Sequence, residues 1–264
     1  MVPWAQQPRP FCDPQARARS SVNRRIESFL RNHRVAVLHE DEHIFVLDKP
    51  SGLLVLPDRY DRTLPNLYEG LRAELGEIFV VHRIDRETSG VLVFAKTATA
   101  HATLSEQFQA RAVEKTYVAI VQGVGTRIEG VIQSDIPVRD DRGIALREAE
   151  SRYRVLEAFR HHCVLEVKPV TGRTHQIRIH LQSIGLPIVG DRLHGDGRPF
   201  YLSQIKPSYK PGSESEKPLL DRAALHAAEL RLAHPKTHEP IVFEADLPKD
   251  MRSVVRALRK YSPS

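Results

Sequence analysis

The densest group of polar residues between apolar segments is Val81-His82-Arg83-Ile84-Asp85-Arg86-Glu87-Thr88-Ser89-Gly90. An apolar run over 78–81 leads into it, and a strand-like run over 91–95 follows it. Charges placed between two buried segments either form a salt-bridged turn or line a cleft. The residues of this stretch alone leave both alternatives open.

The remaining apolar residues follow the alternation of strands and the periodicity of helices. Strands are predicted over 35–38, 44–47, 91–95, 116–122, 153–158, 163–169, 224–232 and 241–245. Helices are predicted over 24–32, 65–75, 98–110, 175–183 and 250–260. The order is not a regular alternation of strand and helix. Paired strands with interspersed helices predict an α+β fold around a mixed or antiparallel sheet.

Composition predicts an ordinary globular protein, because 41% of the 264 residues are hydrophobic. No apolar run reaches the roughly 20 residues of a membrane-spanning helix, and the N-terminus lacks the apolar run of a signal peptide. We therefore expect a cytoplasmic protein without a membrane partner. The formal charge of +6 suits a polyanionic partner but does not establish one. Cys12 and Cys163 are interpreted as free thiols.

The chain is predicted to divide into an N-terminal basic arm with a short helix over 1–34 and one domain over 35–264. Residues 1–22 combine prolines and arginines with few patterned apolar residues, so they are expected to be flexible. Arginines of this arm can touch phosphates, but a solvated leader is the preferred interpretation. The proline-interrupted polar segment 206–218 is predicted to be a loop.

A second polar stretch, Gly172-Arg173-Thr174-His175-Gln176-Ile177-Arg178, follows the strand predicted over 163–169. Thr174 is expected to cap the helix that begins here. Arg173 would stand at the strand-to-helix junction, free to pair with a carboxylate, bind a phosphate or join a surface ion pair. The histidines of the chain lack the spacing of metal ligands, and no carboxylate or cysteine group completes a set, so no metal is expected.

Taken together, these residues resemble the RluA-type family of RNA pseudouridine synthases. The matching segments keep the family's order over residues 35 to about 250, and the departure within the first signature is Ile84 in place of Leu. The matches are Lys49–Leu53, Arg83-Ile84-Asp85, Thr88-Ser89-Gly90, Ala95-Lys96, Lys115-Thr116-Tyr117 with Gly123, Gly172–Arg178, Gly190-Asp191, Leu225-His226-Ala227 and His234-Pro235.

The resemblance implies a pseudouridine synthase fold, with a mixed, largely antiparallel sheet in two halves and a central cleft flanked by helices. It implies an enzyme that isomerises specific uridines in stem-loops of ribosomal RNA, transfer RNA or both, with no cofactor. We expect a monomer without the appended S4-type RNA-binding domain of some relatives. The alternatives are a catalytically silent RNA-binding or RNA-folding protein of the same fold, and a small-molecule glycosidase, which would need a second acidic carboxylate or a metal.

The resemblance also implies roles for single residues. Asp85 is the implied catalytic carboxylate, acting on C1′ of the ribose or first removing a proton from C2′. Arg173 is implied as the cation that pairs with Asp85. Tyr117 is implied to stack on the target base and to remove its C5 proton. Arg83 is implied to fill the position that the flipped uridine leaves in its stack.

Four further cations are expected to contact RNA phosphates, with solvated surface charge as the alternative for each. They are Arg86, Lys96, Lys115 and Arg178. His175 and His226 are expected to form hydrogen bonds behind the site.

Overall fold

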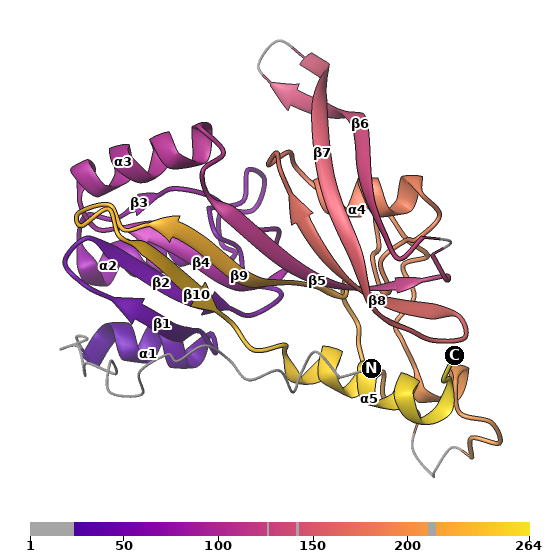
Figure 1. Cartoon of the computed structure of the whole chain (residues 1–264). Helices are drawn as coiled ribbons and strands as arrows, with labels where there is room; N and C mark the ends of the chain where they lie inside the picture. The colour runs from indigo at the N-terminus through magenta and orange to yellow at the C-terminus, as the bar shows by residue number, and fades with distance from the viewer. Residues whose placement is uncertain (1–23, 126, 141–142, 211–214) are drawn as a thin grey trace.

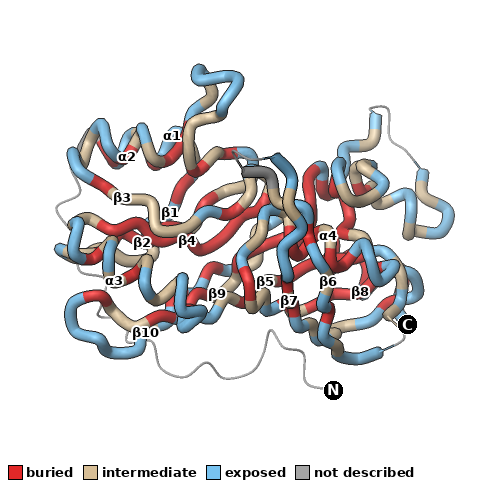
Figure 2. Tube along the Cα trace, turned by 90° about the horizontal axis from the view of Figure 1, so that it is seen from above, coloured by how far each residue is buried: buried red, intermediate tan, exposed pale blue. Residues whose placement is uncertain are grey.

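The computed structural model describes residues 24–125, 127–140, 143–210 and 215–264, and within them the elements form one mixed sheet with helices on its two faces (Figures 1 and 2). The strands are β1 (Ala36–Glu40), β2 (Ile44–Lys49), β3 (Phe79–Val80), β4 (Ser89–Ala95), β5 (Glu114–Gln122), β6 (Glu129–Asp140), β7 (Gly143–Ala158), β8 (His162–Pro169), β9 (Leu225–Ala233) and β10 (Pro240–Glu244). The helices are α1 (Arg24–Asn32), α2 (Leu67–Leu75), α3 (Ala98–Gln109), α4 (Gln176–Ser183), α5 (Lys249–Tyr261) and the 3-10 turn η3 (Leu202–Gln204).

The strand order is β1-β2-β4-β9-β5-β8-β7-β6, with β3 paired to β4 and β10 paired to β9. Every strand pairing among the described residues is antiparallel except that of β4 with β9. We call β1–β4, β9 and β10 with α1–α3 the first half, and β5–β8 with α4 and α5 the second half. The predicted α+β fold with a mixed, largely antiparallel sheet is confirmed.

In the first half, helices cover both faces of the sheet because successive side chains of a strand point to opposite faces. Phe45 and Leu47 of β2 pack in the cluster that contains the buried residues of α1 and α2. The alternate residues Ile44 and Val46 pack in the cluster that contains α3. Leu30 of α1 is only 5% exposed, so the folded unit begins before residue 35. The predicted arm over 1–22 lies outside the described residues.

The core of the second half lies between β5, β8 and two helices. Helix α5 contributes Met251, Val254, Val255 and Leu258, a spacing that puts apolar residues on one helix face. Helix α4 contributes Ile177 and Leu181. None of the helices in the described residues is long and apolar enough to cross a membrane.

The hairpin of β6 and the first part of β7 has no counterpart among the predicted strands. It stands out from the rest of the sheet (Figure 1). Val131, Ile144 and Leu146 are exposed, so the usual alternation of buried and exposed residues is weak here. Pro137 within β6 further lowers the strand signal.

The parallel contact of β4 with β9 places Ser89 opposite His226 and Gly90 opposite Ala227. Gly90 has a φ of +114°, and a Cβ at this position would overlap the backbone of Ala227, so only glycine fits. The Ser89 hydroxyl donates to Nδ1 of His226 at 3.0 Å, and Nε2–H of His226 donates to the Ala245 oxygen at 3.1 Å. These bonds confirm the expected hydrogen-bonding role of His226. They hold the 81–88 loop at the boundary of the two halves.

Acid should destabilise the protein through His226. Burial lowers the pKa of this buried imidazole from 6.5 to about 4, and both ring nitrogens are used by its neutral form. The unfolded chain binds the proton first as the pH falls. The free energy of unfolding should therefore drop between pH 6.5 and 4, by on the order of 3 kcal/mol from this group.

Urea denaturation at pH 7 and pH 4.5 measures the effect, with His226→Gln as the control that cannot titrate. The variant should be less stable than the wild type at pH 7 and should lose less stability on acidification. An equal loss in both proteins would contradict the assignment.

Candidate active site

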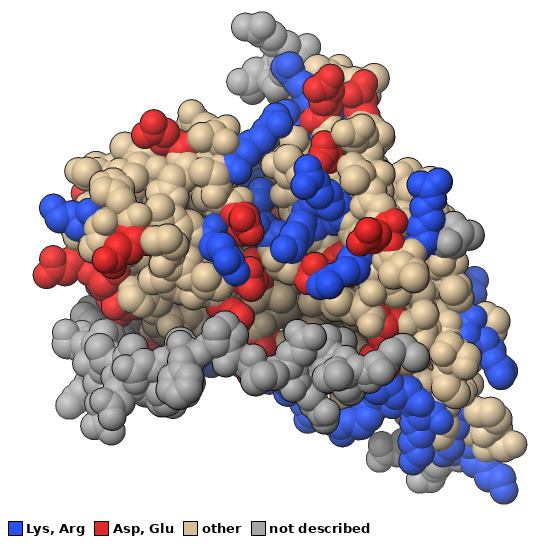
Figure 3. All heavy atoms as spheres, in the orientation of Figure 1, with Lys and Arg blue, Asp and Glu red and all other residues tan. Residues whose placement is uncertain are grey.

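A cleft of about 550 Å³ opens where the two halves meet. Its walls are the loop before β4, the start of β5 and the segment between β8 and α4. Lys and Arg side chains gather around this hollow, with Asp and Glu beside them (Figure 3). Arg83, Asp85 and Thr88 line it, which decides between the two alternatives that the sequence left open for the 81–90 stretch. No cluster of side chains in the described residues is suited to hold a metal ion.

Lys49 holds the loop that carries Asp85. Its fully buried ammonium donates to the oxygens of Pro50, Leu53 and Arg86, at 2.9, 2.8 and 3.1 Å. The N–H of Gly52 donates to the same Arg86 oxygen at 2.8 Å. Burial lowers the pKa of Lys49 to about 7, but three carbonyl acceptors match the three protons of an ammonium and favour the charged form. The resemblance to the family included the segment Lys49–Leu53 but did not predict this structural role of Lys49.

Arg222, in the segment before β9, holds the same loop and ties it to α5 of the second half. Its Nη1 donates to the oxygens of Glu87 and Leu225, at 3.4 and 3.3 Å, and its Nε and Nη2 bind both oxygens of Asp250 at 2.7 and 2.9 Å. The Glu87 carboxylate in turn accepts the N–H of Ala223 at 3.3 Å. Sequence reasoning missed Arg222, because it stands alone in a segment without periodicity.

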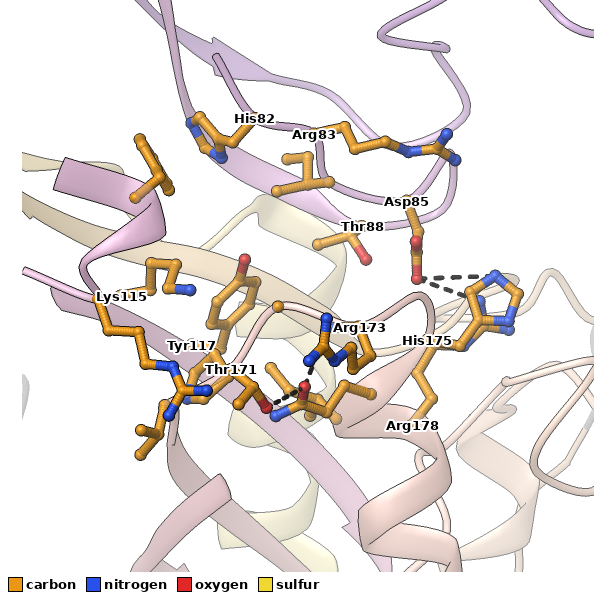
Figure 4. Close-up of a pocket in the computed structure, with 18 of the residues that line it drawn as sticks. His82, Arg83, Asp85, Thr88, Lys115, Tyr117, Thr171, Arg173, His175 and Arg178 are labelled. Carbon is orange, nitrogen blue, oxygen red and sulfur yellow. Dashed lines mark hydrogen bonds and ion pairs between the residues drawn. The ribbon is translucent and has the colours of Figure 1, made fainter. Parts of the chain in front are cut away.

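Arg178 pairs with Asp85 at the wall of the cleft (Figure 4) and also binds Asp191. Its Nη1 lies 3.3 Å from Oδ2 of Asp85, while Nε and Nη2 bind both oxygens of Asp191 at 2.7 and 2.6 Å. Burial would raise the pKa of Asp191, but hydrogen bonds from Arg178 and from the N–H groups of His194 and Leu193 outweigh it and lower that pKa. Arg178 is only 4% exposed, so its charge depends on these two carboxylates.

The prediction that Arg173 pairs with Asp85 is therefore wrong, and Arg178 takes that position. Arg173 also lines the cleft, but its Nε donates weakly to the Glu148 oxygen at 3.4 Å. The physical reason is the position of the helix start. Helix α4 begins at Gln176, which puts Arg178 in its buried first turn and leaves Arg173 before the helix. Arg178 was expected to contact phosphate, and its nitrogens are instead bonded to carboxylates.

Gln176 organises the turn before α4 and was not predicted. Its Oε1 accepts from the Thr171 hydroxyl at 2.6 Å and from the Arg173 N–H at 3.0 Å, and its Nε2 donates to the Glu150 oxygen at 2.8 Å. The predicted cap at Thr174 is wrong. The residue before the helix is His175, in the left-handed region at φ +54°, and it makes no side-chain capping bond.

Tyr117 and Lys115 form the wall that β5 contributes (Figure 4). Burial, followed by the negative charge of Asp85, raises the pKa of Tyr117. Burial also lowers the pKa of Lys115. His82, in the loop before β4, also lines the cleft as a neutral ring, because burial lowers its pKa to about 3 and its Nε2 accepts the Val93 N–H at 3.2 Å.

Of the other predicted RNA contacts, Arg83 is exposed and lines the cleft. Arg86 and Lys96 are not among the residues that line it. Arg86 donates to the Gly52 oxygen at 3.0 Å, and Lys96 pairs with Glu40 at 2.9 Å. Both therefore have structural partners outside the cleft.

The chain is similar to known proteins over most of its length. The family described as RNA pseudouridylate synthase matches residues 43–183. Ribosomal large subunit pseudouridine synthase D of Pseudomonas aeruginosa is 42% identical over 234 residues, which cover 85% of this chain and 72% of the relative. Dual-specificity RNA pseudouridine synthase RluA of Vibrio cholerae is 37% identical over 211 residues, which cover 77% of this chain and 79% of the relative.

Solved structures support the fold. Human RNA Pseudouridylate Synthase Domain Containing 4 matches with a TM-score of 0.67 at 24% sequence identity. The match covers 89% of this chain and 95% of the human chain. The predicted fold is thereby confirmed at the level of its whole architecture.

Replacing Arg178 by Met should destabilise the protein, because Asp191 would be left as a buried carboxylate without its main cation. The expected loss in the free energy of unfolding is about 3–5 kcal/mol, measured by urea denaturation at pH 7. Arg173→Met is the matched control and should change stability by less than about 0.5 kcal/mol.

The double variant Arg178→Met, Asp191→Leu should recover much of the loss, since it removes the unpaired charge. If Arg178→Met is no more destabilising than Arg173→Met, the pair with Asp191 does not support the fold.

Proposed function

The chain belongs to the RNA pseudouridylate synthase family, and we propose that it isomerises uridine in RNA through the carboxylate of Asp85. The observation that carries the role of Asp85 is its pairing with Arg178 inside the cleft. A charged carboxylate in a partly closed cleft needs such a cation to offset lost hydration. The side chain of Asp85 is 20% exposed, so it remains open to a substrate.

The reaction breaks the bond from N1 of uracil to C1′ and forms a bond from C5 to C1′. The proton of C5 leaves and N1 gains one, so atoms balance without a cofactor. Positive charge develops at C1′ as the first bond breaks, and a carboxylate can stabilise this charge or bond to the carbon. Arg178 binds Oδ2 of Asp85, whereas Oδ1 accepts no hydrogen bond within the described residues. We assign Oδ1 to the sugar.

Tyr117 is proposed as the surface on which the uracil stacks. It lines the same cleft as Asp85, and Asp85 is close enough for its charge to raise the pKa of the phenol. The raised pKa keeps the hydroxyl protonated near neutral pH. Removal of the C5 proton by this oxygen therefore requires that the phenol first gives its own proton to another acceptor.

Arg83 is proposed to replace the uridine in its stack. Its exposed side chain lies at the rim of the cleft, from the same loop as Asp85 (Figure 4). A planar guanidinium can stack on the neighbouring bases and bond to their edges, which offsets part of the energy of extruding the base.

Lys115 and Arg173 are proposed to bind the phosphates that flank the flipped nucleotide. Nζ of Lys115 lies 3.8 Å from the position that a Cβ would take at Gly172. Neither Lys115 nor Arg173 has a carboxylate partner among the described ion pairs. Arg173 thus keeps a place in the site in a different role from the one predicted. The name of the Pseudomonas aeruginosa relative suggests ribosomal RNA as the substrate. Transfer RNA, which the resemblance in the sequence also implies, is the second possibility.

Asp85→Asn should abolish turnover while RNA binding persists, because the amide cannot stabilise the charge at C1′. We expect kcat to fall at least 10⁴-fold, and Kd for RNA to change less than about threefold. The assay incubates the protein with unmodified ribosomal RNA and maps pseudouridine by carbodiimide adducts. Equal activity of Asp85→Asn and wild type would overturn the assignment. If the wild type binds ribosomal RNA and transfer RNA but forms no pseudouridine in either, the alternative of a catalytically silent RNA-binding protein is favoured.

Lys115→Gln and Arg173→Gln should weaken RNA binding rather than chemistry. For each variant, the slope of log K against log salt concentration should become shallower by about 1, with Kd raised about tenfold at low salt. Filter binding over a salt series measures both quantities. Lys96→Gln is the control outside the cleft. An unchanged slope in Lys115→Gln and Arg173→Gln would remove these two residues from the phosphate contacts.

A further inference from the structure

His175 and His194 form a pair beside Asp85. Nε2 of His175 lies 4.0 Å from Oδ2 of Asp85, and its Nδ1 lies 3.0 Å from Nε2 of His194. Arg178 also reaches this Oδ2, with its Nη1 at 3.3 Å. His175 and Arg178 thus both lie at Oδ2 of the carboxylate, and Oδ1 is left for the substrate.

The 3.0 Å contact requires that one of the two imidazoles donates and the other accepts. If Nδ1 of His175 donated, its Nε2 would turn a lone pair toward the Asp85 carboxylate, which is repulsive. If Nε2–H of His194 donates, His175 carries its own proton on Nε2 and points it at Oδ2. The charge of Asp85 therefore selects the second arrangement.

This hydrogen-bond arrangement requires both imidazole rings to be neutral, and their surroundings favour the neutral form. Burial is the largest influence and lowers the pKa of both His175 and His194. For His175, Arg178 and Arg83 act in the same direction as burial, while Asp85 and Asp191 oppose it. For His194, Arg178 and His175 lower the pKa, and Asp191 and Asp85 oppose them.

The backbone holds both rings in place. His175 occupies the left-handed region at φ +54°, which is unusual for a residue with a side chain, and its ring lines the cleft. The N–H of His194 donates to Oδ1 of Asp191 at 3.0 Å, and Asp191 is itself bound by Arg178. The same guanidinium therefore sets the positions of Asp85 and of the loop that carries His194.

We propose that His194 is a positioning residue that fixes His175 as the Nε2–H tautomer, and that His175 donates a hydrogen bond to Oδ2 of Asp85 in the reacting complex. The 4.0 Å separation is too long for that bond in the free protein, and such contacts commonly shorten when substrate binds. The inference deepens the proposed function and rests on Asp85 as the catalytic carboxylate. In this arrangement hydrogen bonds hold Oδ2 of Asp85, and Oδ1 is left to react with the sugar.

The test compares His194→Phe, which removes the donor, with His194→Gln, whose amide can donate from a similar position. We expect His194→Phe to lower kcat about 10-fold or more with KM changed less than threefold, and His194→Gln to restore kcat to within about threefold of wild type. His161→Gln, at an exposed histidine, is the control and should match wild type. Thermal unfolding of each full-length variant shows whether folding is affected.

Nitrogen-15 NMR of His175 in the full chain reads the tautomer without any need for turnover. Wild type should show protonated Nε2, and His194→Phe should lose this preference. An Nδ1–H tautomer in the wild type, unchanged kcat in His194→Phe, or equal losses in the Phe and Gln variants would each overturn the proposal. A wild type without isomerase activity would instead overturn the proposed function, and the NMR result would still decide the tautomer.

Discussion

The site depends on one buried guanidinium shared by two carboxylates. Arg178 binds Asp191 through two nitrogens and Asp85 through the third. A buried cation is stable only when its charge and its donors are satisfied, so the three side chains fix one another. This pairing joins α4 and the loop after it to the loop before β4, which lies far from both in the sequence. It also holds Asp85 at the wall of the cleft.

The loop that carries Asp85 is held by side chains from other parts of the chain, which donate hydrogen bonds to its backbone oxygens. Lys49 binds the Arg86 oxygen, and Arg222 binds the Glu87 oxygen. The close approach of Gly90 to Ala227 fixes where β4 begins. The carboxylate is therefore held in place in the free protein, which is the arrangement that the proposed electrostatic role requires.

The predicted elements were mostly confirmed where one face of each is buried, because burial imposes a period on the sequence. The β6–β7 hairpin escaped prediction because Ile144 and Leu146 are exposed and follow no buried face. The pairing of Asp85 was assigned to Arg173 for a related reason. Arg173 and Arg178 belong to one motif, and the sequence alone does not indicate which of the two side chains points into the protein. That depends on the residue at which the helix begins.

By itself, the sequence determined the α+β class, most element positions, the family, and the residues Asp85, Tyr117 and Arg83 as candidates, because periodicity and ordered motifs are properties of neighbours along the chain. Only the tertiary structure decided which cation meets Asp85, that Lys49 and Arg222 hold the loop that carries it, and that His194 lies against His175. Ion pairs and hydrogen bonds join atoms across space, and the energy of each depends on the burial that folding creates.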